Sequence, residues 1–451
     1  MELRNYQEKI IDELMTPLKS AIIQARMGAG KTLTVLEWFQ RYRDHCVSIG
    51  QKKPRMLIIG PIACVDDVWP NEVAKWGFDF TIELLHGKPK EIKPADIYTI
   101  NFESQDFALS QNDKLGCTVL VVDESSKIKN PKSKRTKQLL QSATGFTRRI
   151  GLTGTPRPKS ELDLFTQLTL IDLGKENGKS FYRWREKYFY CGYNKWDWKI
   201  RPDGEAAIDS WSRKNMIVLD KKDEVELPEL LENIVELTMD ASTEKQYKKM
   251  KRELLSTFGD MDVLASSAGV AYQKLKQMAS GFIFENPNDE LDCKPWRINY
   301  QKADAVVDKI EELQGKQVVI FYQHIPLVDA VCEKLKELKI SFARCGGSKT
   351  VDAIKRFRSG EAQCLISHYD SIGYGVNLQD FGCNDVFIIQ PPESASDYDQ
   401  AICRVHRPGV LSTVFVTIFL TKNTVDCLAF DRCKNRIKSQ AEFIRRLVIE
   451  D

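Results

Sequence analysis

Short runs of apolar, β-branched residues alternate with longer segments of mixed polarity along the first 156 residues. Five of these runs are each long enough for one buried strand, and room for a helix separates them: 20–25, 55–60, 96–101, 118–123 and 148–154. Strands that are apolar throughout and alternate with helices are typical of a parallel sheet covered on both faces. The pattern therefore predicts an α/β lobe at the start of the chain.

The pattern changes after this lobe and returns later. Residues 160–300 are rich in charge and helix formers, and an aromatic cluster lies at 181–198. Five more strand-like runs follow: 316–323, 340–347, 362–368, 385–390 and 413–420. The predicted fold class is α/β, with two parallel-sheet lobes and a helical insertion between them. The expected boundaries are 1–160 for lobe 1, 161–295 for helical protrusions and a linker, and 296–451 for lobe 2.

The composition is that of a folded protein. The 451 residues are 42% hydrophobic and 29% charged, with a net charge of +3 that neither requires nor excludes a nucleic-acid partner. There is no apolar run of about 18 residues and no apolar signal core, so no membrane span is expected. The 12 cysteines form no CxxC pair, which argues against a zinc site and indicates a reduced, intracellular protein.

The segment ARMGAGKT, residues 25–32, nearly matches the phosphate-binding pattern G-x-x-x-x-G-K-[ST], with Ala25 in place of the first glycine. It lies between a predicted strand and a predicted helix, so backbone N–H groups and the helix N-terminus would meet phosphate oxygens. Lys31 could reach the β- and γ-phosphates, and the Thr32 hydroxyl could bind Mg²⁺. The alternative is an ordinary glycine-rich turn, which the Gly-Lys-Thr sequence disfavours. The predicted nucleotide-binding residues here are Gly28, Ala29, Gly30, Lys31 and Thr32.

The run at 118–123 ends in two adjacent acids, Asp123 and Glu124. A phosphate-binding loop needs a second Mg²⁺ anchor on a neighbouring strand, and Asp123 suits that role through the metal's water shell. Glu124 could polarise the attacking water. Such an acid pair alone is a weak signal, but after a phosphate-binding loop in the same lobe it predicts a site for ATP and Mg²⁺.

These motifs and others in the same order resemble those of superfamily 2 helicase motors of the SWI/SNF-like ATPase branch, in a compact prokaryotic or phage-type form. The similarity covers nearly the whole chain. The matching segments beyond the phosphate loop are 3–7, 56–76, 123–130, 151–156, 180–189, 226–250, 318–324, 367–379 and 400–409. The resemblance implies two RecA-like lobes, with the ATP-binding loop and acidic box in lobe 1 and arginine fingers in lobe 2.

The resemblance also implies roles for single residues. Gln7 stands at the adenine-reading position, and Arg404 and Arg407 take the arginine-finger positions, where they would stabilise charge at the γ-phosphate. They complete a catalytic set with Lys31, Asp123 and Glu124, and Gly375 and Gln400 complete the nucleotide-binding set. Candidates for DNA contact or coupling, by motif position only, are Thr99, Asn101, Thr153, Thr155, Gln323, Ser367 and Asn377.

Three positions depart from the family's pattern. Ser126 stands in the acidic box where His is usual, Ile372 replaces a usual Gly, and Val410 replaces a usual Gln. Ser126 is the departure closest to the predicted catalytic acids.

Several conspicuous residues have a structural and a functional interpretation. The indoles of Trp184, Trp196 and Trp198 could stack on nucleic-acid bases, but a role in the core of the protrusion is favoured. Packing is also favoured for Trp69 and Trp76. His324 and His406 are expected to be ordinary hydrogen-bonding residues, and the basic run at 127–138 a solvated or phosphate-facing loop.

The leading hypothesis is an ATP-dependent motor that translocates on double-stranded DNA without reading sequence and remodels DNA or protein–DNA complexes. We expect a monomer in the cytoplasm of a prokaryotic cell or a phage-infected host, and leave a protein partner open. One alternative is a helicase that separates strands, or that anneals or branch-migrates them. Another is a nucleotide-dependent scaffold that binds DNA without productive turnover.

Overall fold

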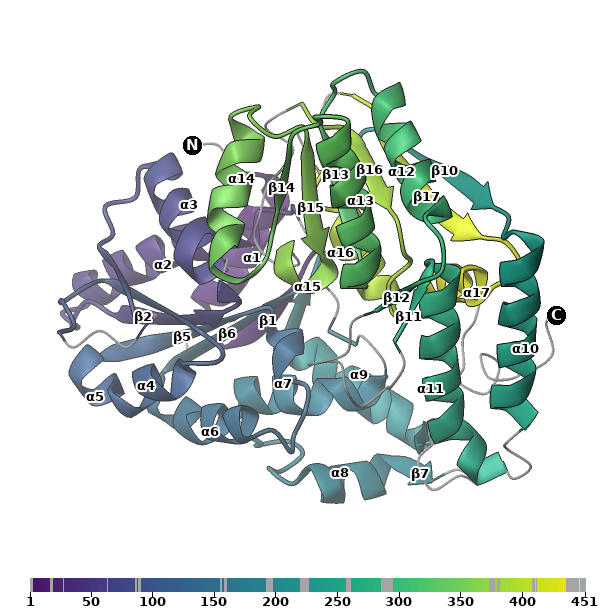
Figure 1. Cartoon of the computed structure of the whole chain (residues 1–451). Helices are drawn as coiled ribbons and strands as arrows, with labels where there is room; N and C mark the ends of the chain where they lie inside the picture. Colours follow the sequence, from purple (N-terminus) through teal and green to yellow (C-terminus); the bar gives the residue numbers. More distant parts are fainter. Residues whose placement is uncertain are drawn as a thin grey trace. The chain divides into compact units, whose positions relative to one another are not determined.

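The computed structural model (Figure 1) divides into two compact units, the first comprising Met1–Glu226 and the second beginning at Leu227. The residues that it describes are 3–16, 19–26, 28–62, 64–85, 87, 91–154, 156–157, 160–191, 198–219, 227–256, 261–284, 295–372, 378, 382–407, 410, 412–434 and 446. Each unit is described separately below.

The first unit is built on a seven-stranded sheet in the order β3-β4-β2-β5-β6-β1-β9, and every neighbouring pair is parallel. Its strands are β1 (Ala21–Gln24), β2 (Arg55–Gly60), β3 (Ile82–Leu84), β4 (Ile97–Asn101), β5 (Cys117–Asp123), β6 (Arg148–Thr153) and β9 (Met216–Val218). Five of them fall in the predicted runs, whereas β3 and β9 are additional. Both are only three residues long, which leaves too short a pattern to detect in the sequence.

Helices cover both faces of this sheet. The α-helices are α1 (Asn5–Met15), α2 (Lys31–Ser48), α3 (Trp69–Trp76), α4 (Gln105–Ser110), α5 (Asn112–Leu115), α6 (Lys134–Ser142) and α7 (Leu164–Asp172). Short turns of other helix types are η1 (Cys64–Val68, π), η2 (Ser125–Ile128), η3 (Ala143–Gly145) and η4 (Glu161–Asp163). Val119 and Val121 pack with α1, α2 and α3, while Leu120 and Val122 pack with α4 and α6. Because alternate residues of a strand face opposite sides, β5 must be apolar throughout.

An aromatic protrusion completes the first unit. It comprises α8 (Phe181–Tyr188), β7 (Phe189–Cys191), β8 (Trp198–Ile200) and α9 (Pro202–Asn215), which share an apolar cluster with α7. Trp184 and Trp211 are fully buried there, with ring centroids 6.2 Å apart, and Phe165 packs 5.1 Å from Trp184. Trp184 therefore belongs to the core of the protrusion, as the sequence favoured, while Trp196 lies outside the described residues. After α9 the chain returns to the sheet, where β9 pairs with β1.

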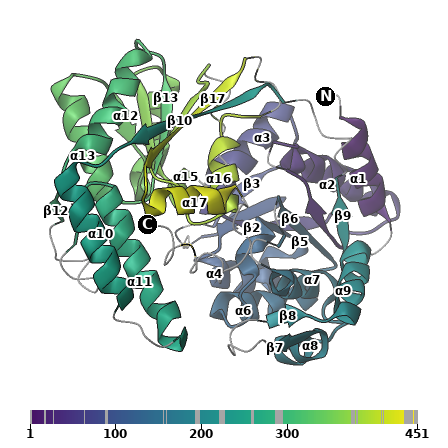
Figure 2. The same ribbon diagram turned by 90° about the vertical axis from the view of Figure 1, so that its right-hand side faces the viewer.

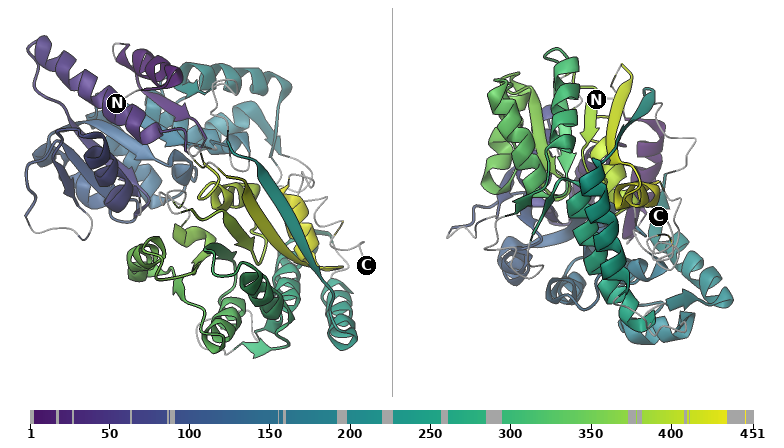
Figure 3. Two further views of the ribbon diagram at one scale, coloured as in Figure 1. Left: turned by 90° about the horizontal axis from the view of Figure 1, so that it is seen from above. Right: turned by 45° about the vertical axis from the view of Figure 1, so that its right-hand side comes forward.

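The second unit has a six-stranded sheet in the order β10-β17-β16-β13-β15-β14, again parallel at every pair. Its strands are β10 (Leu230–Leu237), β13 (Val318–Tyr322), β14 (Phe342–Arg344), β15 (Cys364–His368), β16 (Asp385–Ile388) and β17 (Val414–Thr421). Figure 3 shows β10 running beside β17 at the edge of this sheet. The two parallel sheets with their helices confirm the predicted fold class.

The helices of the second unit include the rest of the predicted insertion. They are α10 (Ala241–Ser256), α11 (Met261–Ala279), α12 (Gln301–Glu312), α13 (Ile325–Glu337), α14 (Thr350–Arg358), α15 (Tyr369–Ile372), α16 (Ala395–Ile402) and α17 (Val425–Cys433), with the turn η6 (Gly347–Lys349) and the hairpin of β11 (Phe282–Ile283) and β12 (Trp296–Arg297). Figure 2 shows α10 and α11 side by side. Tyr247 of α10 and Leu275 of α11 share an apolar cluster with Leu428 of α17. The division at Leu227 thus falls inside the segment 161–295.

Among the helices within the described ranges, none combines the length and the apolar character that crossing a lipid bilayer would require.

Candidate functional site

The glycine-rich segment forms a tight turn between β1 and α2. Gly28 has φ +80° and Gly30 has φ +69°, both in the left-handed region that favours glycine. Gly30 caps the N-terminus of α2, and a Cβ atom there would lie 2.8 Å from Gln7 Nε2. Both the backbone conformation and the close approach of the Gln7 amide therefore favour glycine at this position.

Helix α1 braces this turn. Gln7 Nε2 donates to the Gly30 carbonyl oxygen at 3.3 Å and to Thr34 Oγ1 at 3.2 Å, and the Tyr6 hydroxyl donates to the Ala29 carbonyl oxygen at 2.9 Å. Gln7 Oε1 accepts from the Arg4 backbone N–H at 3.0 Å. The structure thus places Gln7, the predicted adenine-reading residue, against the phosphate loop. Its side-chain amide makes hydrogen bonds to residues of the first unit.

Lys31 and Thr32 occupy the first turn of α2. Lys31 Nζ donates to the carbonyl oxygens of Ala25 and Arg26 at 2.8 and 3.0 Å, so the ammonium group lies over the loop. The Thr32 side chain is half-buried. The Ala25 N–H donates to the Thr153 carbonyl oxygen at 3.2 Å, which joins the loop to the end of β6.

Asp123 ends β5, two strands away from β1. Its Oδ2 atom accepts a hydrogen bond from Trp69 Nε1 at 2.9 Å. Burial raises the pKa of Asp123, the neighbouring charge of Glu124 raises it further, and the Trp69 bond and the positive charge of Lys31 oppose that rise. The structure therefore brings Lys31 and Asp123 within electrostatic reach of each other.

Glu124 follows with φ +58° and ψ +59°, a left-handed conformation that is uncommon outside glycine. Its side chain is buried, and Oε1 accepts from Ser126 Oγ at 2.7 Å and from Thr153 Oγ1 at 3.3 Å. Ser126, which departs from the family's pattern, therefore contacts the predicted catalytic acid directly. So does Thr153, a predicted coupling residue.

Gln167 is a buried polar residue of α7 that sequence reasoning missed. Its Oε1 accepts from Ser125 Oγ at 2.9 Å, and its Nε2 donates to the carbonyl oxygens of Pro156 and Asp163 at 2.7 and 2.8 Å. It therefore ties the acidic box to the segment that follows β6. A glutamine within the apolar run LFTQLTLID is the signal that could have identified it.

Two further candidates of the first unit lie on β4. Thr99 and Asn101 are buried, and Asn101 Nδ2 donates to Glu103 Oε2 at 2.9 Å. Asn101 pairs with Gly60 of β2, the strand next to β5. Three of the predicted residues lie outside the described part of the chain: Thr155, Gly375 and Asn377.

The predicted arginine fingers belong to the second unit, on the turn after α16. Arg404 is 2% exposed and Arg407 is 9% exposed. The Arg404 carbonyl oxygen accepts from the Leu378 N–H at 3.2 Å, and Arg407 Nε donates to the Cys403 carbonyl oxygen. Gln400 on α16 donates to Ser396 Oγ at 3.3 Å.

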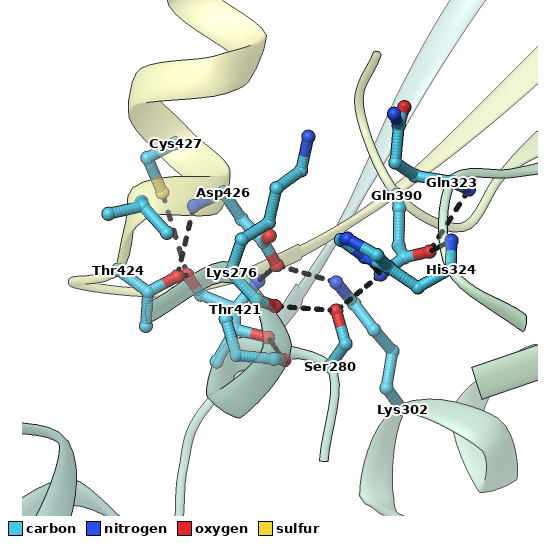
Figure 4. Close-up of polar contacts among 12 residues, drawn as sticks. Lys276, Ser280, Lys302, Gln323, His324, Gln390, Thr421, Thr424, Asp426 and Cys427 are labelled. Carbon is cyan, nitrogen blue, oxygen red and sulfur yellow. Dashed lines mark hydrogen bonds and ion pairs between the residues drawn. The ribbon is translucent and has the colours of Figure 1, made fainter. Parts of the chain in front are cut away.

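Gln390 anchors a polar network at the carboxyl ends of β13 and β16 (Figure 4). Its Oε1 accepts from the backbone N–H groups of Gln323 and His324 at 3.1 and 2.8 Å. Its Nε2 contacts Ser280 Oγ at 2.6 Å and His324 Nδ1 at 2.9 Å. The backbone of the candidate residue Gln323 is thereby fixed to the end of α11. Ser367, on β15, is buried and donates to the His368 carbonyl oxygen at 2.9 Å.

Comparison with known proteins identifies the family. The model of the SNF2-related domain matches residues 6–284, and that of the helicase conserved C-terminal domain matches residues 301–409. The first model alone spans more than half of the chain. The two matches together follow the same order as the motifs above.

Several curated proteins are similar to the chain. "Putative protein p41" of Acyrthosiphon pisum secondary endosymbiont phage 1 is 26% identical, with 95% of each chain covered. "Uncharacterized ATP-dependent helicase MG018" of Mycoplasma genitalium is 25% identical over 100% of this chain and 42% of that protein. "Transcription regulatory protein SNF2" of Saccharomyces cerevisiae is 23% identical over 98% of this chain and 28% of that protein. The chain therefore spans nearly all of the phage protein but less than a third of the yeast protein.

A solved structure, "Sulfolobus solfataricus SWI2/SNF2 ATPase core in complex with dsDNA", is 21% identical and aligns over 100% of this chain and 97% of that chain, with a TM-score of 0.43. The family assignment comes from the two domain matches. The chain belongs to the SNF2-related family of helicase-like ATPases.

Proposed function

We propose that this protein hydrolyses ATP to translocate on double-stranded DNA, independently of sequence, and thereby remodels DNA or protein–DNA complexes. The observation that carries the proposal lies in the first unit. Asp123 is within electrostatic reach of Lys31 at the phosphate loop, and Glu124 beside it accepts from Ser126 and Thr153. Membership of the SNF2-related family supports the assignment of this arrangement to ATP hydrolysis.

The nucleotide would be held by the turn Gly28–Gly30 and the N-terminus of α2. Lys31 would leave its two loop carbonyls to neutralise the β- and γ-phosphates. Thr32 and Asp123 would hold Mg²⁺, which prefers oxygen donors and usually keeps several waters. The residues fit this ion, because the Asp123 carboxylate can accept more bonds than the one from Trp69. Bound Mg²⁺ would offset negative charge on the phosphates.

Glu124 would orient and polarise the attacking water. Its two hydroxyl donors hold one carboxylate oxygen, which leaves the second oxygen to accept a proton or a hydrogen bond. Arg404 and Arg407 of the second unit would supply positive charge to the γ-phosphate. Gln7, Gly375 and Gln400 complete the proposed nucleotide contacts.

DNA would be gripped through its sugar-phosphate backbone. Such contacts carry no sequence information and weaken as salt concentration rises. The proposed contact or coupling residues of the first unit are Thr99, Asn101, Thr153 and Thr155, and those of the second unit are Gln323, Ser367 and Asn377. We also propose that the protein acts as a monomer in the cytoplasm of a prokaryotic or phage-infected cell, which the similarity to a phage protein supports.

Steady-state ATP hydrolysis in the presence of duplex, forked, four-way and single-stranded DNA tests this function. We expect duplex DNA to stimulate hydrolysis most, and Lys31→Ala to remove the stimulated rate. Stimulation by single strands alone would contradict duplex translocation. Unwinding of the forked substrate would favour a strand-separating helicase, and equal rates for wild type and Lys31→Ala would favour a scaffold without turnover.

A further inference from the structure

The indole N–H, the only polar group of the Trp69 side chain, donates a hydrogen bond to a residue of the proposed metal site. The residue begins α3 and is 0% exposed, and its Nε1–H donates to Asp123 Oδ2 at 2.9 Å. An indole has one donor and no acceptor, so the ring can make no second hydrogen bond of this kind. The sequence favoured a packing role for Trp69, and packing alone does not account for a buried N–H aimed at a carboxylate.

The backbone around Trp69 is shaped to bring the ring to the end of β5. A π-helical turn, η1 (Cys64–Val68), directly precedes Trp69, and such turns are rare and frequently occur at functional sites. At the end of β2, a Cβ atom on Gly60 would lie 3.1 Å from Asp123 Cβ and 3.3 Å from Val65 Cγ1. A glycine at residue 60 therefore lets the chain leading to Trp69 pass close to Asp123.

The ring itself has no freedom to turn away. Trp69 belongs to the buried apolar cluster that α1, α2 and α3 form on one face of the sheet, together with Val65 and Val73. An aromatic ring packed in this way holds one rotamer. Its N–H is consequently a fixed donor that can orient the Asp123 carboxylate.

The charges around Asp123 explain why a fixed donor is useful. The Lys31 ammonium attracts the Asp123 carboxylate, and the Glu124 carboxylate repels it. An Asp123 that closed onto Lys31 would withdraw both groups from the nucleotide. The Trp69 N–H competes with that attraction by holding one carboxylate oxygen.

We propose that Trp69 is a positioning residue for the Mg²⁺–nucleotide complex, and that it acts by fixing the orientation of the Asp123 carboxylate. The inference rests on the proposed ATP-binding function of the first unit. It assigns to the segment that links β2 to α3 a role in metal affinity, separate from its role in the core.

The test uses a matched pair of substitutions on one helix. Trp69→Phe keeps an aromatic ring and removes the N–H that reaches Asp123. Trp76→Phe removes an indole N–H that donates to Glu72 Oε2 at 2.7 Å. Glu72 lies four residues before Trp76 on α3, and this hydrogen bond does not involve Asp123. Both variants of the full chain lose one indole–carboxylate hydrogen bond, but only the first loses a bond to the metal site.

The primary readout is metal affinity rather than turnover. Electron paramagnetic resonance of Mn²⁺, used in place of Mg²⁺, gives its affinity for the protein–ADP complex. We expect Trp69→Phe to weaken Mn²⁺ binding about 10- to 100-fold, the usual effect of removing a group that orients a metal ligand, and Trp76→Phe to leave it unchanged. Equal Mn²⁺ affinity in Trp69→Phe and wild type would overturn the proposal.

Two further measurements separate positioning from folding and from the proposed function itself. Thermal unfolding reports whether Trp69→Phe is folded, and if it is not, Gly60→Ala provides the second variant. Its Cβ atom would lie 3.1 Å from Asp123 Cβ and 3.3 Å from Val65 Cγ1, so Asp123 or the segment leading to Trp69 must shift by a few tenths of an ångström. Gly60→Ala is expected to weaken Mn²⁺ binding at least several-fold, and unchanged binding would overturn the proposal. Failure of the wild-type protein to bind ADP with Mn²⁺ would instead contradict the proposed function.

Discussion

At the scale of single residues, Glu124 occupies a backbone conformation that costs about 1–3 kcal/mol for a residue other than glycine. The surrounding hydrogen bonds stabilise this conformation. Ser126 and Thr153 donate to its carboxylate, and the next residue, Ser125, donates to the buried Gln167. This local order is what a residue needs in order to orient a water molecule repeatedly in one direction.

Replacing Glu124 by Gln tests its proposed role. The amide keeps the shape of the side chain but cannot accept a proton, so we expect the hydrolysis rate to fall about 10²- to 10⁴-fold with little change in nucleotide affinity. Single-turnover hydrolysis and equilibrium binding of labelled ATP give the two quantities. Glu205→Gln, at an exposed position on α9, is the control and should match the wild type. A Glu124→Gln variant with a wild-type rate would exclude Glu124 as the group that activates water.

The residues proposed for the chemistry could be selected from the sequence because their types and spacing are themselves the signal. Lys31, Asp123 and Glu124 each stand in a short motif at the end of an apolar run. The partners that hold them could not be predicted in the same way. Trp69 reaches Asp123 from 54 residues away, and Gln167 reaches Ser125 from 42 residues away. Such pairs follow from tertiary packing, which no local pattern encodes.

At the scale of elements, the glycine-rich turn depends on α1 as well as on its own sequence. Gly30→Ala would place a Cβ atom 2.8 Å from Gln7 Nε2, in addition to the cost of about 1–2 kcal/mol for a left-handed alanine. We expect lower thermal stability and, because the turn is displaced, at least a tenfold loss of ATP affinity. Thermal unfolding and binding of labelled ATP measure the two effects.

Gly50→Ala is the matched control for that experiment. Gly50 has φ +73°, close to the value at Gly30, but a Cβ atom there would have nothing within 4 Å. The control should therefore show the backbone cost in stability without the loss of ATP affinity. Equal ATP affinity in the two variants would mean that contact with Gln7 does not shape the turn.

The network around Gln390 should make the second unit sensitive to acid. Gln390 Oε1 accepts two backbone N–H groups, so its Nε2 must donate to His324 Nδ1, which requires a neutral imidazole. Burial, together with the positive charges of Lys276, His368 and Lys302, lowers the pKa of His324 to about 3. The unfolded chain binds this proton below its ordinary pKa of 6.5. The contribution of His324 to the stability of the folded protein is thus fully present above pH 6.5 and declines as the pH falls toward 3.

We expect this histidine to contribute a slope of up to about 1.4 kcal/mol per pH unit below pH 6.5. His324→Asn keeps an acceptor but cannot take up the proton, so its unfolding temperature should fall less between pH 7.5 and pH 5 than that of the wild type. His45→Asn, at an exposed position, is the control. An unchanged pH dependence in His324→Asn would show that the ring is not held neutral by the network.

The elements themselves show where sequence patterns are informative. The ten long apolar runs correspond to strands of the two sheets, because a strand buried on both faces leaves a continuous apolar signal. β10 lacks that signal, since most of its residues are half-buried or exposed at the edge of its sheet, and it pairs with β17 far along the chain. The position of the division at Leu227 follows from these non-local pairings and could not be predicted from composition.

At the scale of the whole molecule, the proposed catalytic groups are shared between the two units. The phosphate loop, Asp123 and Glu124 belong to the first, and Arg404 and Arg407 belong to the second. If arginines from one unit act on a phosphate bound by the other, hydrolysis depends on the approach of the two units. In the proposed function, that dependence would convert ATP hydrolysis into movement along DNA.

Displacement of a third strand from a DNA triplex tests this central claim most directly. A protein that moves along the duplex removes the third strand without separating the duplex strands. We predict that wild-type protein displaces the third strand only when ATP is present, and that Lys31→Ala does not displace it. Duplex-stimulated ATP hydrolysis without displacement, or equal displacement by wild type and Lys31→Ala, would contradict the account.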